Sequence, residues 1–339
     1  MTDATFWRHL DALATRLEPA FAIVYRRVLT QLRSRLVIAP LVRMLGDGDI
    51  DRVLAYVFDT PEAKAILREL EIEYATAVVR TIPSVERFLP TTPGTLSLRV
   101  RAPVASPAIT QAVRQWSDQS FKNVVAEMRE GVRTVVAQGI TDGLGPRAIA
   151  VALKSQTSAI GLTAYDESII ASFRAKLLAG DRSALSRALR DRRFDRTVAK
   201  GNLTPAQIDT MVGAYRRKLV ALRAETFART SAVQAANDAN RATWQQAIDD
   251  GTYRMEEVKG YWIVADDERL CPRCKGIPAL NDSGRRLDEL FATTEDGDVQ
   301  GPTIHPSCRC TIWWRHESPR LTPRPAPGTD RFIFTEADR

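Results

Sequence analysis

Residues 258–315 read VKGYWIVADDERLCPRCKGIPALNDSGRRLDELFATTEDGDVQGPTIHPSCRCTIWWR, and they hold every cysteine of the 339-residue chain. The other 281 residues contain none. One of the three histidines of the chain lies between the two cysteine pairs. Such clustering indicates one shared site rather than four separate buried thiols. The candidate metal ligands are Cys271, Cys274, His305, Cys308 and Cys310.

The spacing of these donors favours a structural metal site. Cys271 and Cys274 form a C-x-x-C pair, a tight turn that can direct two thiolates at one point. Cys308 and Cys310 are two residues apart, so an extended segment would place them on the same side. With His305 there are five potential donors, and structural zinc takes about four. A closed shell of this kind leaves no position for a reactive water, so we expect zinc as a structural cofactor.

Two other states of the cysteines stay open. The thiols can remain reduced without a metal, or they can form two disulfides in any of three pairings. The N-terminus is amphipathic and does not resemble a secretion signal, so we expect a reducing compartment. A thioredoxin-like redox pair would need a βαβ context, which this segment lacks.

The segments on both sides of the cysteines resemble strands. Residues 258–265 and 311–314 are rich in β-branched and aromatic residues. We therefore expect a small C-terminal α+β module held together by the cysteine site, because so few residues bury little core. Asp266 and Asp267 are expected in a turn, with a hydrogen bond from this turn to His305 as an alternative.

The rest of the chain predicts a mainly α fold with long helices. Apolar residues recur at spacings of three and four over 4–36, where Pro19 should kink or divide the helix. A second helix should begin after Thr60 and be closed by Pro83. Further helices are expected after Ser106, near 149–153, at 164–178 and from Pro205 to about Asp249. The expected division is an N-terminal helical region 1–82, a Pro-rich arm or hinge 83–106, a helical body 107–250, the cysteine and histidine module 251–316 and an extended tail 317–339.

Three segments are candidate contact surfaces. They are the Pro-rich arm at 83–106, the basic stretch 187–196 and the apolar triplet Phe332 to Phe334 in the tail. The net charge of +7 and the pI of about 9.4 are compatible with DNA contact. No apolar run approaches the ~18 residues of a membrane span, so no membrane partner is expected.

The run from Trp262 through the C-x-x-C pair, followed by Gly301-Pro302 and the H-P-x-C-R-C ending at 305–310, resembles a known family. It is similar to the C-terminal module of phage Mu F-like minor head proteins, also called phage head morphogenesis proteins. The similarity is strongest over residues 205–315. It implies a virion protein assembled in the host cytoplasm and placed inside the head near the portal. The implied partners are the portal protein, the major capsid or scaffold protein, and DNA.

One helix departs from the family pattern. Ala228-Arg229-Thr230 is present, but Ser231 stands where the family usually has glutamate, so a role for that carboxylate does not carry over. Two functions from other classes stay open: a zinc-dependent DNA-binding protein and an HNH-like nuclease. The module has His305 and, at its edge, His316, fewer histidines than a nuclease site with a base and metal ligands would need. Phosphate-loop, G-x-S-x-G and H-E-x-x-H motifs are absent from the sequence, and we expect no enzymatic activity.

Overall fold

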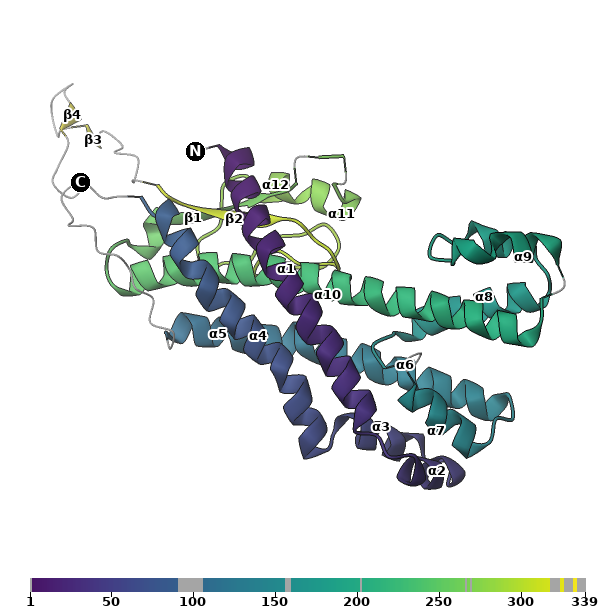
Figure 1. Ribbon diagram of the computed structural model, residues 1–339. Coiled ribbons are helices and arrows are strands. Elements are labelled where there is room, and N and C mark those ends of the chain that lie inside the picture. The colour runs from purple at the N-terminus through teal and green to yellow at the C-terminus, as the bar shows by residue number, and fades with distance from the viewer. Residues whose placement is uncertain are drawn as a thin grey trace. The chain divides into compact units, whose positions relative to one another are not determined.

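A computed structural model describes residues 2–90, 106–155, 160–201, 203–265, 267–268 and 270–317, together with the backbone of two short strands beyond them (Figure 1). The chain is mainly helical with a small two-stranded sheet, as the sequence predicts. It divides into two compact units. The cysteine unit comprises Met1–Leu13, Val78–Thr110 and Val233–Arg339, and the helical unit comprises Ala14–Ala77 and Gln111–Ala232.

Both units are assembled from segments far apart in the sequence, unlike the consecutive ranges expected above. The reason is that long helices pass from one unit into the other. The elements up to α10 are α1 (Asp3–Ser34), α2 (Ile38–Gly46), α3 (Ile50–Phe58), α4 (Pro61–Val85), η1 (Glu86–Phe88), α5 (Pro107–Trp116), the π-helical turn η2 (Ser117–Phe121), α6 (Lys122–Thr141), α7 (Pro146–Lys154), α8 (Ala164–Leu178), η3 (Arg182–Ser186), η4 (Arg192–Phe194), α9 (Asp195–Lys200) and α10 (Pro205–Asp249).

The helix starts follow their capping residues. The hydroxyl oxygen of Thr60 accepts from the backbone N–H of Ala63 at 3.2 Å, and that of Ser106 accepts from Ile109 at 3.3 Å. Each cap satisfies one of the N–H groups that a helix start leaves without an intrahelical partner. The predicted helix from Pro205 to Asp249 is confirmed as α10, an unbroken helix of 45 residues.

Helix α1 continues through Pro19 without being divided. The prediction that Pro83 closes its helix is wrong, since α4 continues past Pro83 to Val85. A proline inside a helix costs about 3 kcal/mol because it removes a hydrogen bond and crowds the preceding turn. At the end of α4 burial offsets this cost: Val85 is fully buried and packs in one cluster with Phe6 and Leu10 of α1.

Aromatic side chains fill the core of the helical unit. Tyr25 of α1 stacks on Phe227 of α10 with ring centroids 4.7 Å apart, and Tyr74 of α4 stacks on Trp116 of α5 at 4.3 Å. Gly131 lets α6 approach the segment that contains Leu162, since a Cβ there would lie 2.0 Å from the carbonyl oxygen of Leu162.

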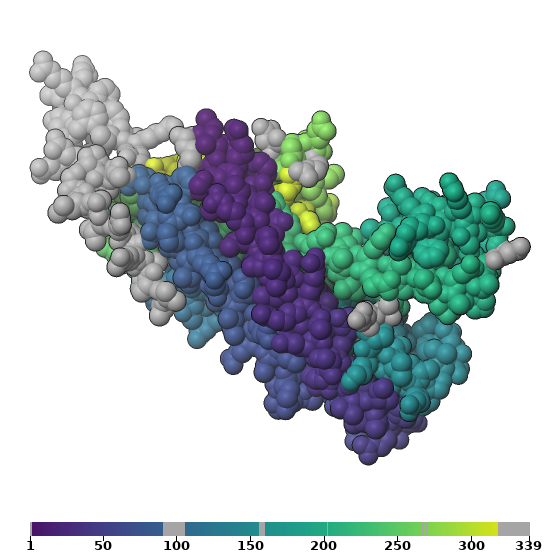
Figure 2. All heavy atoms as spheres, viewed as in Figure 1, coloured from purple at the N-terminus to yellow at the C-terminus, as the bar shows by residue number. Residues whose placement is uncertain are grey.

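On the face shown in Figure 2, α1 is visible in purple as part of the molecular surface.

The cysteine unit contains the expected strands. Strand β1 (Val258–Ile263) pairs antiparallel with β2 (Thr311–His316), with Val258 opposite His316 and Ile263 opposite Thr311. Gly260 is required where the ring of Trp314 crosses β1, because a Cβ would lie 2.5 Å from that ring. The remaining elements are η5 (Met255–Glu257), α11 (Pro272–Lys275), α12 (Ile277–Leu280), β3 (Arg324–Pro325) and β4 (Phe332–Ile333).

Aromatic residues from distant segments pack around the sheet. One buried cluster contains three of the cysteines and four aromatic residues: Trp244 at the end of α10, Trp262 of β1, Trp314 of β2 and Phe291.

None of the described helices is long and apolar enough to cross a membrane. Most of the Pro-rich arm and the side chains of the Phe332 to Phe334 triplet lie outside the described residues.

Candidate metal centre

The structure brings all five predicted ligands together. Cys271, Cys274 and His305 form one group and Cys274, Cys308 and Cys310 a second, and the donor atoms within each group lie within 4.8 Å of one another. Cys274 belongs to both groups, so its sulfur joins them. All four cysteines are free thiols, which agrees with a metal site or reduced thiols rather than with the disulfide alternative.

The cluster has a buried side and a more accessible side. Cys274, Cys308 and Cys310 are at most 2% exposed, whereas Cys271 and His305 are partly exposed. The buried sulfurs therefore lie in the hydrophobic core, and a metal would enter past the other two donors.

The first cysteine pair is positioned by one turn of helix. Cys271 is the N-cap of α11 in an extended conformation, and Pro272 follows at the first helical position. The carbonyl of Cys271 accepts from the backbone N–H of Cys274 at 3.0 Å. Burial raises the pKa of the Cys271 thiol, but hydrogen bonds from the backbone N–H groups of Arg273 and Cys274 outweigh it, so the net pKa is lowered.

The imidazole of His305 is oriented as a metal ligand. Its Nδ1 lies 2.9 Å from the carbonyl oxygen of Pro306, and because a carbonyl can only accept, Nδ1 carries the proton. Its Nε2 faces the sulfur of Cys274 at 3.0 Å. A backbone partner at one ring nitrogen commonly fixes the tautomer that leaves the other free for a metal.

The loop that carries His305 is strained. Thr303 has φ 78° and Ser307 has φ 59°, and they are the described non-glycine residues with positive φ. A β-branched residue such as Thr303 rarely adopts this conformation. Strain of about 1–3 kcal/mol per residue persists only where the surroundings enforce it, commonly at functional sites. Both residues lie within two positions of His305.

Without a metal the cluster shares its protons unevenly. Hydrogen bonds from Cys274 and Cys310 lower the pKa of Cys308, which favours its thiolate form. The hydrogen bond to Cys308 raises the pKa of Cys274 to about 12, and hydrogen bonds to Cys274 and Cys308 raise that of Cys310. The hydrogen bond with Cys308 raises the pKa of His305 to about 9. Metal binding would release these protons, since metals bind thiolates and neutral imidazole.

Two buried asparagines of α10 hold the second cysteine pair. The side-chain N–H₂ of Asn237 donates to the carbonyl of Cys310 at 3.3 Å, and its oxygen accepts from the hydroxyl of Thr311 at 2.8 Å and from the backbone N–H of Ile312 at 3.1 Å. Asn240, one turn further on, donates to the carbonyl of Ile312 at 2.8 Å. Sequence reasoning missed this role. The signal was two amides within the buried, alanine-rich face of α10.

Arg309 anchors the segment between Cys308 and Cys310. Its guanidinium makes two contacts with the carboxylate of Asp267, at 2.5 and 2.6 Å. Its carbonyl accepts from the indole N–H of Trp7 at 2.7 Å. Asp267 thus binds Arg309, and Asp266 lies outside the described residues.

The other histidine of the module is used elsewhere. His316 lies at the end of β2 away from the cysteines, with its Nε2 3.4 Å from a carboxylate oxygen of Glu257 and its ring 5.0 Å from that of Tyr253. It lies six positions along an extended segment from Cys310, about 20 Å at 3.3 Å per residue. A second histidine for an HNH-like site is therefore not supplied by His316.

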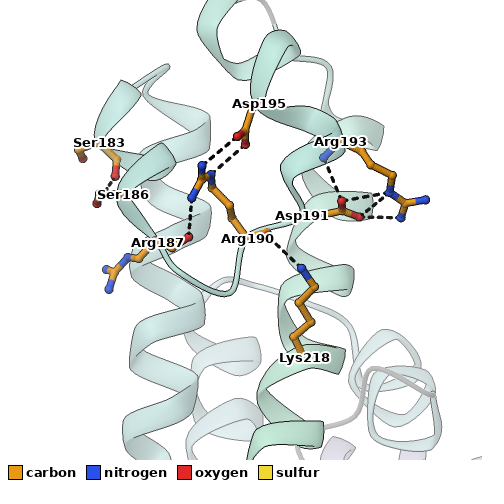
Figure 3. Close-up of polar contacts among 8 residues, drawn as sticks. All are labelled: Ser183, Ser186, Arg187, Arg190, Asp191, Arg193, Asp195 and Lys218. Carbon is orange, nitrogen blue, oxygen red and sulfur yellow. Dashed lines mark hydrogen bonds and ion pairs between the residues drawn. The ribbon is translucent and has the colours of Figure 1, made fainter. Parts of the chain in front are cut away.

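Two of the five arginines in the basic stretch 187–196 pair with its two aspartates (Figure 3). Arg190 makes two contacts of 2.9 Å with Asp195, and Arg193 pairs with Asp191 at 2.6 Å. Instead of a continuous helical face, this stretch forms a 3₁₀ turn followed by the start of α9. The pairing reduces the charge that this stretch can offer to a partner.

Comparisons with family models, curated proteins and solved structures found no match to this chain. The chemistry of the site is therefore inferred from its own residues. Four sulfurs and one imidazole nitrogen, joined through Cys274, can hold a metal ion.

Proposed function

We propose that this chain is a minor capsid protein of a bacteriophage that acts in head assembly and lies inside the head near the portal. The observation that carries the proposal is the H-P-x-C-R-C segment, residues 305–310. His305, Cys308 and Cys310 are candidate ligands, and Arg309 ties the segment to Asp267. The positions that carry the resemblance to phage head morphogenesis proteins are thus the ones that hold the module together, which supports a common module.

We infer further that the bound metal is zinc and that its role is structural. Thiolate and imidazole donors are the usual zinc ligands in proteins. Cys274, Cys308 and Cys310 would supply three ligands, and His305 or Cys271 the fourth. Such an ion would link α11 to the loop before β2, in a module whose small core gains most from a crosslink. With four protein ligands it has no position for a water to be activated, so we propose no enzymatic activity.

The portal protein is the proposed principal partner, with major capsid or scaffold protein and DNA as further ones. The test is size-exclusion chromatography of the full-length chain with portal rings and with proheads, at low and high salt. We expect co-elution with the portal. A chain that binds neither portal rings nor proheads at any salt concentration, and yet binds free DNA tightly, would contradict the proposal in favour of a zinc-dependent DNA-binding protein.

A further inference from the structure

A pocket of about 470 Å³ in the helical unit is lined by basic side chains from three helices. Its volume lies within the range of about 300–1,000 Å³ that is usual for ligand sites. None of the described residues that line it is acidic. The lining residues that matter here are Arg26, Thr30 and Arg33 of α1, Lys154 of α7 and Arg217 of α10.

The helical repeat places the lining residues of α1 on one face of that helix. Arg26, Thr30 and Arg33 are four and three residues apart, so they lie on one face of α1. The hydroxyl of Thr30 accepts from the Arg33 guanidinium at 3.2 Å, which orients Arg33 along this face. Lys154 donates to the carbonyl oxygens of Leu36 at 2.5 Å and Ser34 at 3.4 Å, at the C-terminal end of α1.

Two of the cations have no counter-charge. Among the described residues, Arg26 and Arg217 have no ion-pair partner, and both are exposed. The neighbouring Arg27, on another face of α1, pairs with Glu69 at 2.8 Å. Like charges gathered around one pocket repel each other, and an anion in the pocket would relieve this repulsion. Burial also lowers the pKa of Arg33, so this cation is poorly solvated.

We propose that this pocket binds a phosphate group, and that the phosphodiester backbone of DNA supplies it. Guanidinium groups bind phosphate oxygens with two parallel hydrogen bonds, which matches an arginine-lined pocket. The choice of DNA as the source rests on the proposed function, in which the chain lies inside the DNA-filled head. The inference places the expected DNA contact in this pocket and not in the basic stretch 187–196, where Arg190 and Arg193 are already paired with Asp195 and Asp191 (Figure 3).

The test compares two variants of the full-length protein that lose the same charge. The pocket variant carries Arg26→Gln and Arg217→Gln. The control carries Arg174→Gln and Arg193→Gln, which removes two arginines of the same unit that pair with Asp209 and Asp191. Binding of a labelled DNA duplex is followed by fluorescence anisotropy between about 50 and 200 mM salt.

We expect the plot of log K against log salt to become shallower by about 1 for the pocket variant, since the pocket holds one phosphate and each lost phosphate contact removes about 0.9. The control should keep the wild-type slope. Equal slopes for wild type and pocket variant, or an equal loss in the control, would overturn DNA as the ligand. Thermal melts of both variants establish that they remain folded.

A second arm uses inorganic phosphate alone. If phosphate raises the melting temperature of the wild type but not of the pocket variant, while DNA binding is the same for both, the phosphate pocket is retained and DNA is rejected as its source. If neither ligand distinguishes the variants, the pocket inference is wrong. A chain that binds portal rings and shows no slope difference would still support head assembly, so the two proposals can fail separately.

Discussion

Replacing Asn237 with alanine is expected to destabilise the cysteine unit through the backbone of the second cysteine pair. The Asn237 side chain makes three hydrogen bonds to residues 310–312 and a fourth to the carbonyl of Val233 in its own helix at 2.9 Å. Its exposed fraction is 7%, so water cannot replace these partners easily.

The magnitude follows from the bonds lost. Each neutral hydrogen bond contributes about 1 kcal/mol net, and a buried partner left unsatisfied costs about 1–3 kcal/mol. Three bonds to the strand segment therefore predict a loss of about 3 kcal/mol in the free energy of unfolding, a large part of the ~5–15 kcal/mol typical of proteins. Asn240→Ala provides the matched control. It is on the same face and fully buried, but has one such bond, and its own side-chain oxygen has no partner among the described residues, so about 1 kcal/mol is expected.

The measurement is urea unfolding of both variants, together with the rate at which a chromophoric chelator removes zinc from zinc-loaded protein. Asn237→Ala should shift the midpoint about three times as far as Asn240→Ala and release metal faster. A loss in Asn237→Ala no larger than in Asn240→Ala would refute the view that this amide positions Cys310.

Elemental analysis of untagged protein purified without chelator should find about one zinc per chain, and less than about a tenth of that would refute the metal proposal. Cys308→Ser should lower both zinc content and melting temperature more than Cys271→Ser, because Cys308 is completely buried and Cys271 is partly exposed; equal effects would contradict the division into buried and accessible ligands. Purified protein should leave supercoiled plasmid intact in the presence of Mg²⁺ or Mn²⁺, and nicking that His305→Ala abolishes would favour the nuclease instead.

The donors and strands were predictable because their signals are local. Cysteine spacing places the five donors near one another, and β-branched and aromatic runs identify β1 and β2. The role of Asn237 was not predictable, because helical periodicity identifies a buried face but not which distant strand lies against it. Pro83 was misjudged for a similar reason: burial of Val85 against α1 is a long-range effect. The pairing of Arg193 with Asp191 depends on a 3₁₀ turn that composition alone does not specify.

The two asparagines on α10 have a consequence for contacts between copies of the chain. Strand β2 uses one side for β1, and the backbone groups on its other side are potential attachment points for a foreign strand. At Ile312 the N–H and the carbonyl on that side are occupied by Asn237 and Asn240. The amides thus take the place of a neighbouring strand at Ile312, which leaves these two backbone groups unavailable for pairing with a strand of another copy.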